Sequence, residues 1–206
     1  MHLRQPLHIY TDGAAFKEDR RCAYGWLLAN PEHLLTPARV VSVDYAELGA
    51  PRCAASSLME AEAVTDALCE FRYRDRPLVV HTDSLSLVEV IQSYRDGSRS
   101  GDYFLQTPTS IRPATGRRLL AALDKGDARV EWVKAHGVSY HNRVIDQALR
   151  HACKGMGERE AAGFAATAVA EGRARVWDSW HTAEGWASTW KSISLETFGR
   201  SEALHA

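Results

Sequence analysis

Two aspartates stand where predicted strands end, and a carboxylate in such a position can do chemistry. Asp12 closes an alternating segment at 7–12, and Asp83 closes an apolar segment at 78–83. Ser84 directly follows and is predicted to cap the next helix. Functional side chains collect at strand ends in α/β sheets. A buried carboxylate is costly unless it is paired or binds a cation. Taken singly, however, each aspartate is more often a turn or capping residue.

A predicted helix at 56–73 carries a third acid, and helix geometry separates two candidates. At about 100° per residue, Glu60 falls roughly 40° from the centre of the apolar stripe, so it is predicted to face the sheet. Glu62 falls roughly 160° away and is predicted to face solvent. The stripe consists of Ala61, Val64, Ala67, Leu68 and Phe71.

The fourth acid is Asp146, in a helix predicted to run from its cap at Asn142 to about residue 154. The alternative role for Asp146 is an i,i+4 ion pair with Arg150, worth about 0.3–0.5 kcal/mol. His136 lies just upstream, in a glycine-containing loop that substrate could reach. The alternative for His136 is an ordinary surface loop residue.

Four carboxylates without soft ligands suit a hard cation such as Mg²⁺ or Mn²⁺. A pair of such ions about 3.5–4 Å apart can stabilise the attacking and leaving oxygens in phosphodiester cleavage. The sequence contains no zinc-type cysteine pairs, no Gly-x-Ser-x-Gly elbow and no phosphate-binding glycine loop. Pattern alone does not establish that the four acids converge.

The elements that must position these acids alternate in the order βββαβαβα, which indicates an α/β fold with a mixed sheet of five strands flanked by helices. A loop-rich insertion at 95–127 precedes the last strand. Its basic residues are consistent with a solvated loop. They are Arg95, Arg99, Arg112, Arg117, Arg118 and Lys125.

The 206 residues divide into a predicted domain at 1–154 and a tryptophan-rich extension at 155–206. The extension is predicted to be helical, because an alanine-rich segment is followed by tryptophans spaced three and four residues apart. These tryptophans are expected to pack against the domain or a second copy, or else to contact a partner or nucleic acid. They are Trp177, Trp180, Trp186 and Trp190.

The net charge of −1 excludes a protein that coats nucleic acid by bulk electrostatics. If a cation neutralised the four acids, the rest of 1–154 would be modestly basic, so nucleic acid stays open as a substrate. No apolar run is long enough to cross a bilayer, and no secretion signal is recognisable. Together with four scattered cysteines, these features predict a cytoplasmic protein with reduced thiols.

Six blocks of sequence resemble the type 1 ribonuclease H (ribonuclease HI) family, in order and on the expected elements. The resemblance covers about residues 6–154 and implies an RNase H-like fold. The blocks are IYTDG at 9–13, YG at 24–25, SLMEA at 57–61, HTDS at 81–84, WVKAH at 132–136 and NRVID at 142–146.

The resemblance implies an endoribonuclease that cuts the RNA strand of RNA–DNA hybrids with two Mg²⁺ ions, for which Mn²⁺ can substitute. Asp12 would bridge both ions, Glu60 and Asp83 would complete the ligands of one, and Asp146 would bind the other. His136 would assist proton transfer or product release. In-line hydrolysis would leave a 5′-phosphate and a 3′-hydroxyl.

The same resemblance implies that Gly13, Ser56, Ser57, Ser84 and Asn142 contact the substrate. It also implies a reduced substrate contact by the basic residues of the 95–127 insertion. The serines at 56 and 57 replace asparagines that are common in the family. Hybrid preference is therefore less secure than the metal chemistry. Two alternatives stay open: an RNase H-fold nuclease that acts on DNA or structured nucleic acid, and a non-catalytic module that binds nucleic acid.

Overall fold

The computed structural model describes residues 5–16, 19–30, 35–48, 54–71, 76–103, 111–125, 127–134, 139–182 and 185–202. Its strands are β1 Leu7–Phe16, β2 Arg21–Leu28, β3 Ala38–Asp44, β4 Leu78–Thr82, β5 Ala128–Trp132, β6 Arg173–Thr182 and β7 Gly185–Ser194. Its helices are α1 Tyr45–Leu48, α2 Ala55–Phe71, α3 Leu85–Arg95, α5 Pro113–Leu123, α6 Tyr140–Cys153, α7 Glu158–Glu171 and α8 Leu195–Glu202.

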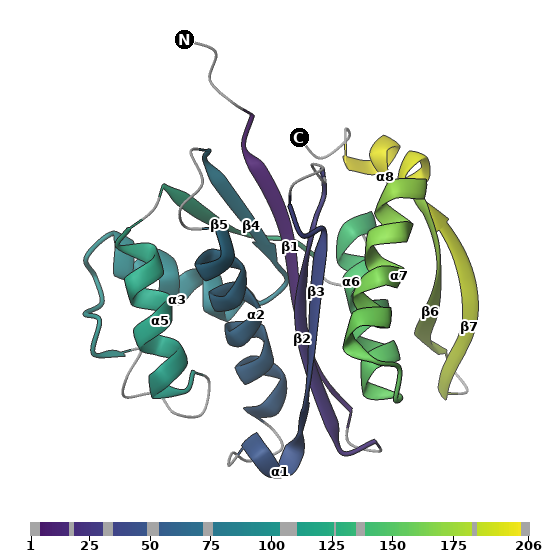
Figure 1. Cartoon of the computed structure of the whole chain (residues 1–206), viewed down its shortest axis with the longest axis horizontal. Helices are drawn as coiled ribbons and strands as arrows, with labels where there is room; N and C mark the ends of the chain where they lie inside the picture. The colour runs from purple at the N-terminus through teal and green to yellow at the C-terminus, as the bar shows by residue number, and fades with distance from the viewer. Residues whose placement is uncertain are drawn as a thin grey trace.

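The main sheet has five strands in the order β3-β2-β1-β4-β5 (Figure 1). Strands β1, β2 and β3 pair antiparallel, whereas β4 pairs parallel with β1 and with β5. Strand β1 is therefore central, with Asp12 opposite Gly25 on β2 and Tyr10 opposite His81 on β4. This arrangement confirms the predicted mixed five-stranded sheet and its element order.

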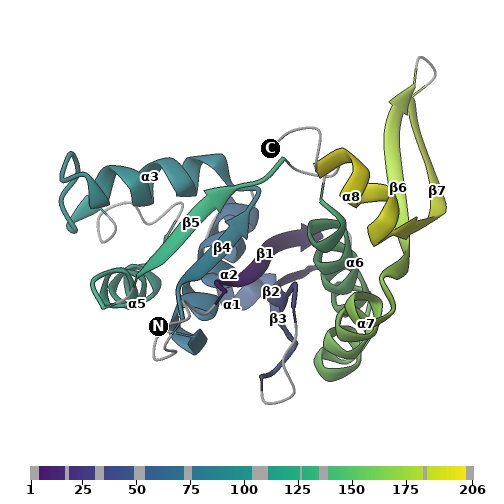
Figure 2. The same ribbon diagram turned by 90° about the horizontal axis from the view of Figure 1, so that it is seen from above.

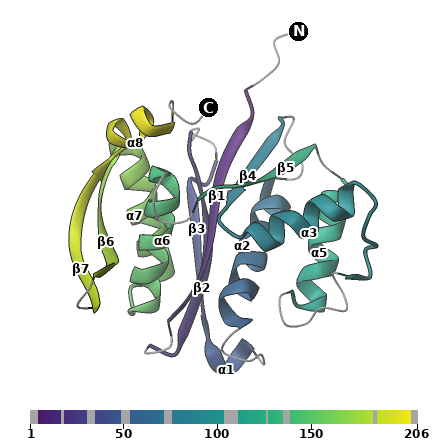
Figure 3. The same ribbon diagram turned by 180° about the vertical axis from the view of Figure 1, so that it is seen from behind.

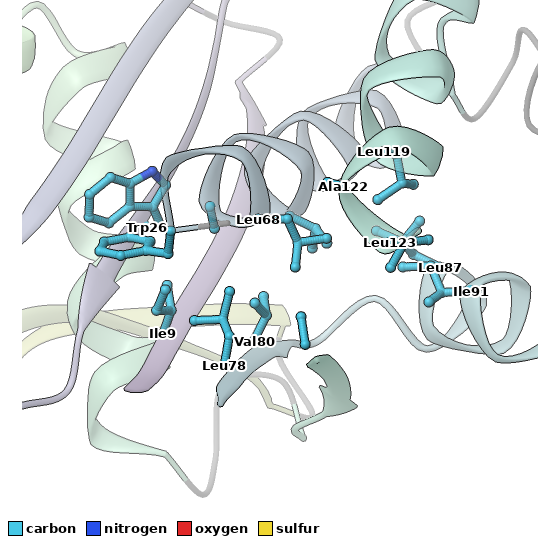
Figure 4. Close-up of a cluster of buried hydrophobic side chains, with 14 of the residues drawn as sticks. Ile9, Trp26, Leu68, Leu78, Val80, Leu87, Ile91, Leu119, Ala122 and Leu123 are labelled. Atoms are coloured by element: carbon cyan, nitrogen blue, oxygen red, sulfur yellow. The ribbon is translucent and has the colours of Figure 1, made fainter. Parts of the chain in front are cut away.

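One face of the sheet is covered by α2, with α3 and α5 beyond it (Figure 2). Residues of β1 with odd numbers, such as Leu7 and Ile9, point into this side because side chains alternate along a strand. Figure 4 shows the resulting apolar core, in which Trp26 packs edge-on against Phe71. The Trp26 indole N–H donates to the buried Asp66 carboxylate at 3.0 Å, so its one polar atom is satisfied.

The opposite face is covered by α6 and then α7, with the β6–β7 hairpin outside them (Figure 3). Helix α6 packs on β1, β2 and β3, and small residues such as Ala148 and Ala152 let it approach the sheet closely. Helix α7 packs against α6 through Ala161, Ala165 and Ala168. The α6 helix is consequently enclosed between the main sheet and the C-terminal extension.

The prediction of a helical extension is correct for α7 and α8 and wrong for residues 173–194, which form the antiparallel β6–β7 hairpin. The physical reason is composition: this segment is rich in tryptophan and also contains threonine, valine and isoleucine, all of which favour strands. Trp177 and Trp190 therefore do not lie on a helix face but opposite each other across the hairpin. The division of the chain at 154, and any association through the extension, stay predictions.

Two helix starts differ from expectation. Helix α6 begins at Tyr140, and its cap is Ser139, whose hydroxyl accepts the Asn142 backbone N–H at 3.4 Å. Ser84 does precede α3, but its side chain makes no capping hydrogen bond. Within the described residues, no helix has the length and apolar character needed to cross a membrane.

Candidate active site

Asp12 lies at the centre of the site, on the face of β1 that looks toward α6. Its side chain is buried at 6% exposure, and the Gly13 backbone N–H donates to Asp12 Oδ1 at 2.7 Å. Burial raises the pKa of Asp12 well above its usual range, and the charges of Asp83, Asp146 and Glu60 raise it further. The structure therefore brings the other three predicted carboxylates within electrostatic reach of Asp12, which lies inside β1 and not at its end as predicted.

Gly13 permits the approach of β1 to α2. A Cβ atom at this position would lie 2.1 Å from the Glu60 backbone nitrogen and 2.3 Å from the Met59 carbonyl carbon. Only glycine fits here, and its absent side chain brings Asp12 beside the first turns of α2. Ser56 spans the same junction, since its hydroxyl lies 3.3 Å from the Gly13 carbonyl oxygen and 3.4 Å from Glu60 Oε1.

Glu60 is half-buried on the side of α2 that faces the other acids. Burial raises the pKa of Glu60, and the charge of Asp83 raises it further, whereas hydrogen bonds from Ser84 and Ser56 lower it. The Ser84 hydroxyl thus serves Glu60 instead of capping α3. Two serines on separate elements therefore orient one carboxylate.

The prediction that Glu62 faces solvent is wrong. Glu62 is buried because helix α5 packs across α2 and covers it. The Thr115 hydroxyl donates to Glu62 Oε1, and Arg118 Nη1 lies 3.5 Å from Glu62 Oε2. Helix periodicity located the sheet-facing side of α2 but held no information about a second helix on its outer side. Glu62 faces away from the carboxylate cluster and has a packing role.

Asp83 is held by two groups that come from distant segments. The Asn142 side-chain amide donates to Asp83 Oδ2 at 3.5 Å, and the Trp132 indole N–H donates to the Asp83 carbonyl oxygen at 3.2 Å. Asn142 is buried at 1% exposure, and its Oδ1 atom has no partner among the described residues. A buried amide oxygen of this kind is an acceptor available to a ligand.

Asp146 faces the cluster and also makes the predicted ion pair along α6. Arg150 Nε donates to both carboxylate oxygens of Asp146, at 3.1 and 3.0 Å. The ion-pair alternative is therefore confirmed, but it does not exclude the other role, because the charge of Asp146 still raises the pKa of Asp12. Asp146 is buried, while the arginine keeps partial access to solvent.

Two of the five predicted substrate contacts line one cleft. Ser57 and Ser84 line a cleft of about 90 Å³ between α2 and α3, which Ser86 and Tyr103 also line. His136 falls within 135–138, outside the described residues, and its role stays a prediction.

The basic residues of the 95–127 insertion that the structure describes are partly committed to the fold. Arg95 and Arg112 donate to backbone carbonyl oxygens of other segments. Arg118 forms ion pairs with Glu62 and Asp66, at 3.5 and 3.6 Å. These three guanidinium groups therefore contribute to packing, which limits what the insertion can offer a substrate.

A stack of aromatic rings beside the cluster was missed at the sequence level. Tyr10 stacks between His81 and His141, with centroids 4.5 and 4.8 Å away, and His8 Nδ1 lies 3.0 Å from His81 Nε2. Burial, with the nearby histidines, lowers the pKa of His81 and of His141 to about 4. The signal available was strand alternation, since Tyr10 and His81 occupy paired positions on adjacent strands.

The donor set fits hard divalent cations. All four carboxylates offer oxygen, which Mg²⁺ and Mn²⁺ prefer. The raised pKa of the buried Asp12 shows that these like charges oppose one another, a cost that a bound cation relieves. Among the described residues, no three His, Cys, Asp or Glu side chains lie close enough to form a ready-made metal cage.

Comparison with known proteins agrees with this geometry. A family model described as RNase H matches residues 4–154. A curated protein named Ribonuclease H, from Syntrophomonas wolfei subsp. wolfei (strain DSM 2245B / Goettingen), is 28% identical over 151 residues. That alignment covers 72% of this chain and 97% of the relative.

Proposed function

Because the chain belongs to the RNase H family, as the resemblance of its motifs implied, we propose that it is an endoribonuclease that hydrolyses the RNA strand of RNA–DNA hybrids. The observation that carries the proposal is the buried Asp12, whose pKa is raised by burial and by the charges of Asp83, Asp146 and Glu60. A protein gains nothing in stability from such a cluster, so a role in catalysis accounts for it.

In this proposal, Asp12, Glu60, Asp83 and Asp146 would hold two Mg²⁺ ions, or Mn²⁺ in their place. When bound, such ions stabilise the charge that develops on the attacking and leaving oxygens of an in-line displacement. The donor set supports the choice of metal, because every one of the four side chains is a carboxylate.

The remaining residues of the site orient these carboxylates. The Gly13 N–H donates to Asp12, and the Asn142 amide donates to Asp83. A hydrogen bond to the ionised form favours it, so the Gly13 N–H offsets part of the rise that burial causes in the pKa of Asp12. Outer partners of this kind are worth about 10–100-fold in metal affinity or activity.

Recognition of RNA is assigned to the polar groups around the acids: Gly13, Ser56, Ser57, Ser84 and Asn142. A 2′-hydroxyl is both donor and acceptor and is the group that distinguishes RNA from DNA. The unpartnered Asn142 Oδ1 is a suitable acceptor for it. His136, which precedes α6 in the sequence, would assist proton transfer or product release.

Digestion of four labelled substrates of one sequence tests the proposal: an RNA–DNA hybrid, double-stranded RNA, double-stranded DNA and single-stranded RNA. With Mg²⁺, we expect cleavage of the hybrid's RNA strand alone, leaving a 5′-phosphate and a 3′-hydroxyl. Equal cleavage of the DNA duplex would replace the proposal with the DNA-directed alternative. Binding of the hybrid without cleavage would support the non-catalytic module instead.

A further inference from the structure

The C-terminal extension holds helix α6, which carries both Asp146 and Asn142. The extension lies beyond residue 154, where the matched family region ends. The extension contacts α6 near its first turn and along its second half, and Asp146 lies between these two regions. Whatever fixes the ends of a short helix also fixes the side chains between them, since its backbone is rigid.

Near the first turn, the contact is a single buried hydrogen bond. Tyr140, the first residue of α6, is fully buried, and its hydroxyl donates to the Ala168 carbonyl oxygen of α7 at 2.7 Å. Ala168 lies on the last turn of α7, just before the chain enters β6.

Along the second half of α6, Gln147 joins the helix to the hairpin. The side chain of Gln147 follows Asp146 directly and is buried at 2% exposure. Its Oε1 atom accepts the Trp177 backbone N–H of β6 at 2.6 Å, and its Nε2 atom lies 3.2 Å from His151 Nε2. Both ends of a buried amide are thus engaged, which is the arrangement that gives such a group a defined position.

An aromatic cluster completes the contact one turn later. The ring of His151 lies between Phe164 of α7, at 5.0 Å and 71°, and Trp190 of β7, at 6.3 Å and 19°. Trp177 meets Trp190 edge-on at 5.5 Å. Figures 1 and 3 show the same layering, with α6 between the main sheet on one side and α7 and the hairpin on the other.

We propose that Gln147 is a positioning residue: by accepting the Trp177 amide it couples the C-terminal hairpin to α6 and sets the placement of Asp146 in the carboxylate cluster. This inference rests on the proposed function for its catalytic readout. It makes the extension part of the catalytic apparatus, although the four acids of the carboxylate cluster all lie before residue 155.

The test uses the full chain with Gln147→Ala, which removes the acceptor, and Gln147→Glu, which retains an oxygen at that position. Gln92→Ala is the matched control, because Gln92 is an exposed glutamine of α3. We expect Gln147→Ala to lower kcat on the hybrid about tenfold, the lower bound for an outer partner, with KM within twofold of wild type. Titration calorimetry without substrate should show several-fold weaker Mg²⁺ binding, and Gln147→Glu should recover much of both.

A purely structural role would lower the Tm and the folded fraction while kcat per folded molecule and Mg²⁺ affinity stay at the wild-type values, and that result would overturn the inference. So would a Gln147→Glu protein no better than Gln147→Ala. If Gln147→Ala does not fold, Gln147→Met keeps the length of the side chain but removes the oxygen that accepts the Trp177 N–H, and an unchanged kcat and Mg²⁺ affinity there would equally overturn it. If the wild type cleaves no hybrid, the proposed function fails, whereas the Mg²⁺ affinities still decide the positioning role.

Discussion

Substitution of Gly13 by alanine should damage both stability and catalysis, because β1 and α2 meet there through backbone atoms. The new Cβ would lie 2.1 Å from the Glu60 nitrogen, and ordinary contact begins at 3.4 Å, so α2 must move by about 1.3 Å. Backbone cannot rotate away as a side chain can. We therefore expect the upper range for overpacking, about 3 kcal/mol, and a Tm lower by roughly 6–12 °C.

The same displacement separates Glu60 from Asp12, so kcat should fall about 100-fold even when the variant is folded at the assay temperature. The matched control is Gly163→Ala, at an exposed position of α7 where no atom lies within 4 Å of the added Cβ. Replacing a mid-helix glycine there should raise stability by about 0.5–1 kcal/mol without changing kcat. Thermal melts and initial rates on a hybrid provide both readouts. A Gly13→Ala protein with wild-type Tm and kcat would refute the close contact between β1 and α2.

Three further predictions separate roles within the site. Glu60→Gln should abolish cleavage with little change in Tm. Glu62→Gln should instead lower the free energy of unfolding by about 1–3 kcal/mol and leave kcat of the folded fraction intact. Thermal melts and initial rates on a hybrid measure both effects. Burial lowers the pKa of His141 to about 4 in the folded protein, so the unfolded chain binds a proton at this residue first as the pH falls. The free energy of unfolding is therefore highest above pH 6.5 and decreases as the pH falls from 6.5 toward 4. Denaturant titrations at several pH values should show that His141→Phe loses less free energy of unfolding between pH 6.5 and 4 than wild type, by about 1.4 kcal/mol per pH unit. Parallel plots of the free energy of unfolding against pH for the two proteins would disprove this role of His141. Arg150→Gln removes a partly exposed i,i+4 pair and should cost only about 0.5 kcal/mol; a Tm drop beyond roughly 2 °C would mean that Arg150 has a larger structural role.

The sheet was predictable because its signals are local and strong. Alternation along β1, the apolar run of β4 and the short connections between β1, β2 and β3 predicted the element order and the position of Asp83 just after β4. The prediction that Asp12 ends its strand is wrong, because β1 continues to Phe16 by pairing with β2. The sheet-facing side of α2 followed from its apolar stripe. These patterns depend on periodicities of the backbone, which the sequence carries directly.

The failures have a common physical cause, which is packing between segments far apart in the chain. Burial of Glu62 depends on α5, more than fifty residues away, and its partner Thr115 carries no signal in the sequence. The hairpin at 173–194 was missed because tryptophans three and four residues apart also suit a helix face. Ser84 was assigned to a cap because its alternative partner, Glu60, lies on another element.

The most direct test of the central claim is the initial rate of hybrid cleavage by the wild type and by Asp12→Asn, each with Mg²⁺ and with a chelator. Asparagine keeps the size of Asp12 but removes the charge that the carboxylate cluster requires. Only the wild type with Mg²⁺ should cleave, while both proteins should melt as folded domains. Full-rate cleavage by Asp12→Asn, or by the wild type with the chelator, would contradict the assignment of a metal-dependent carboxylate site.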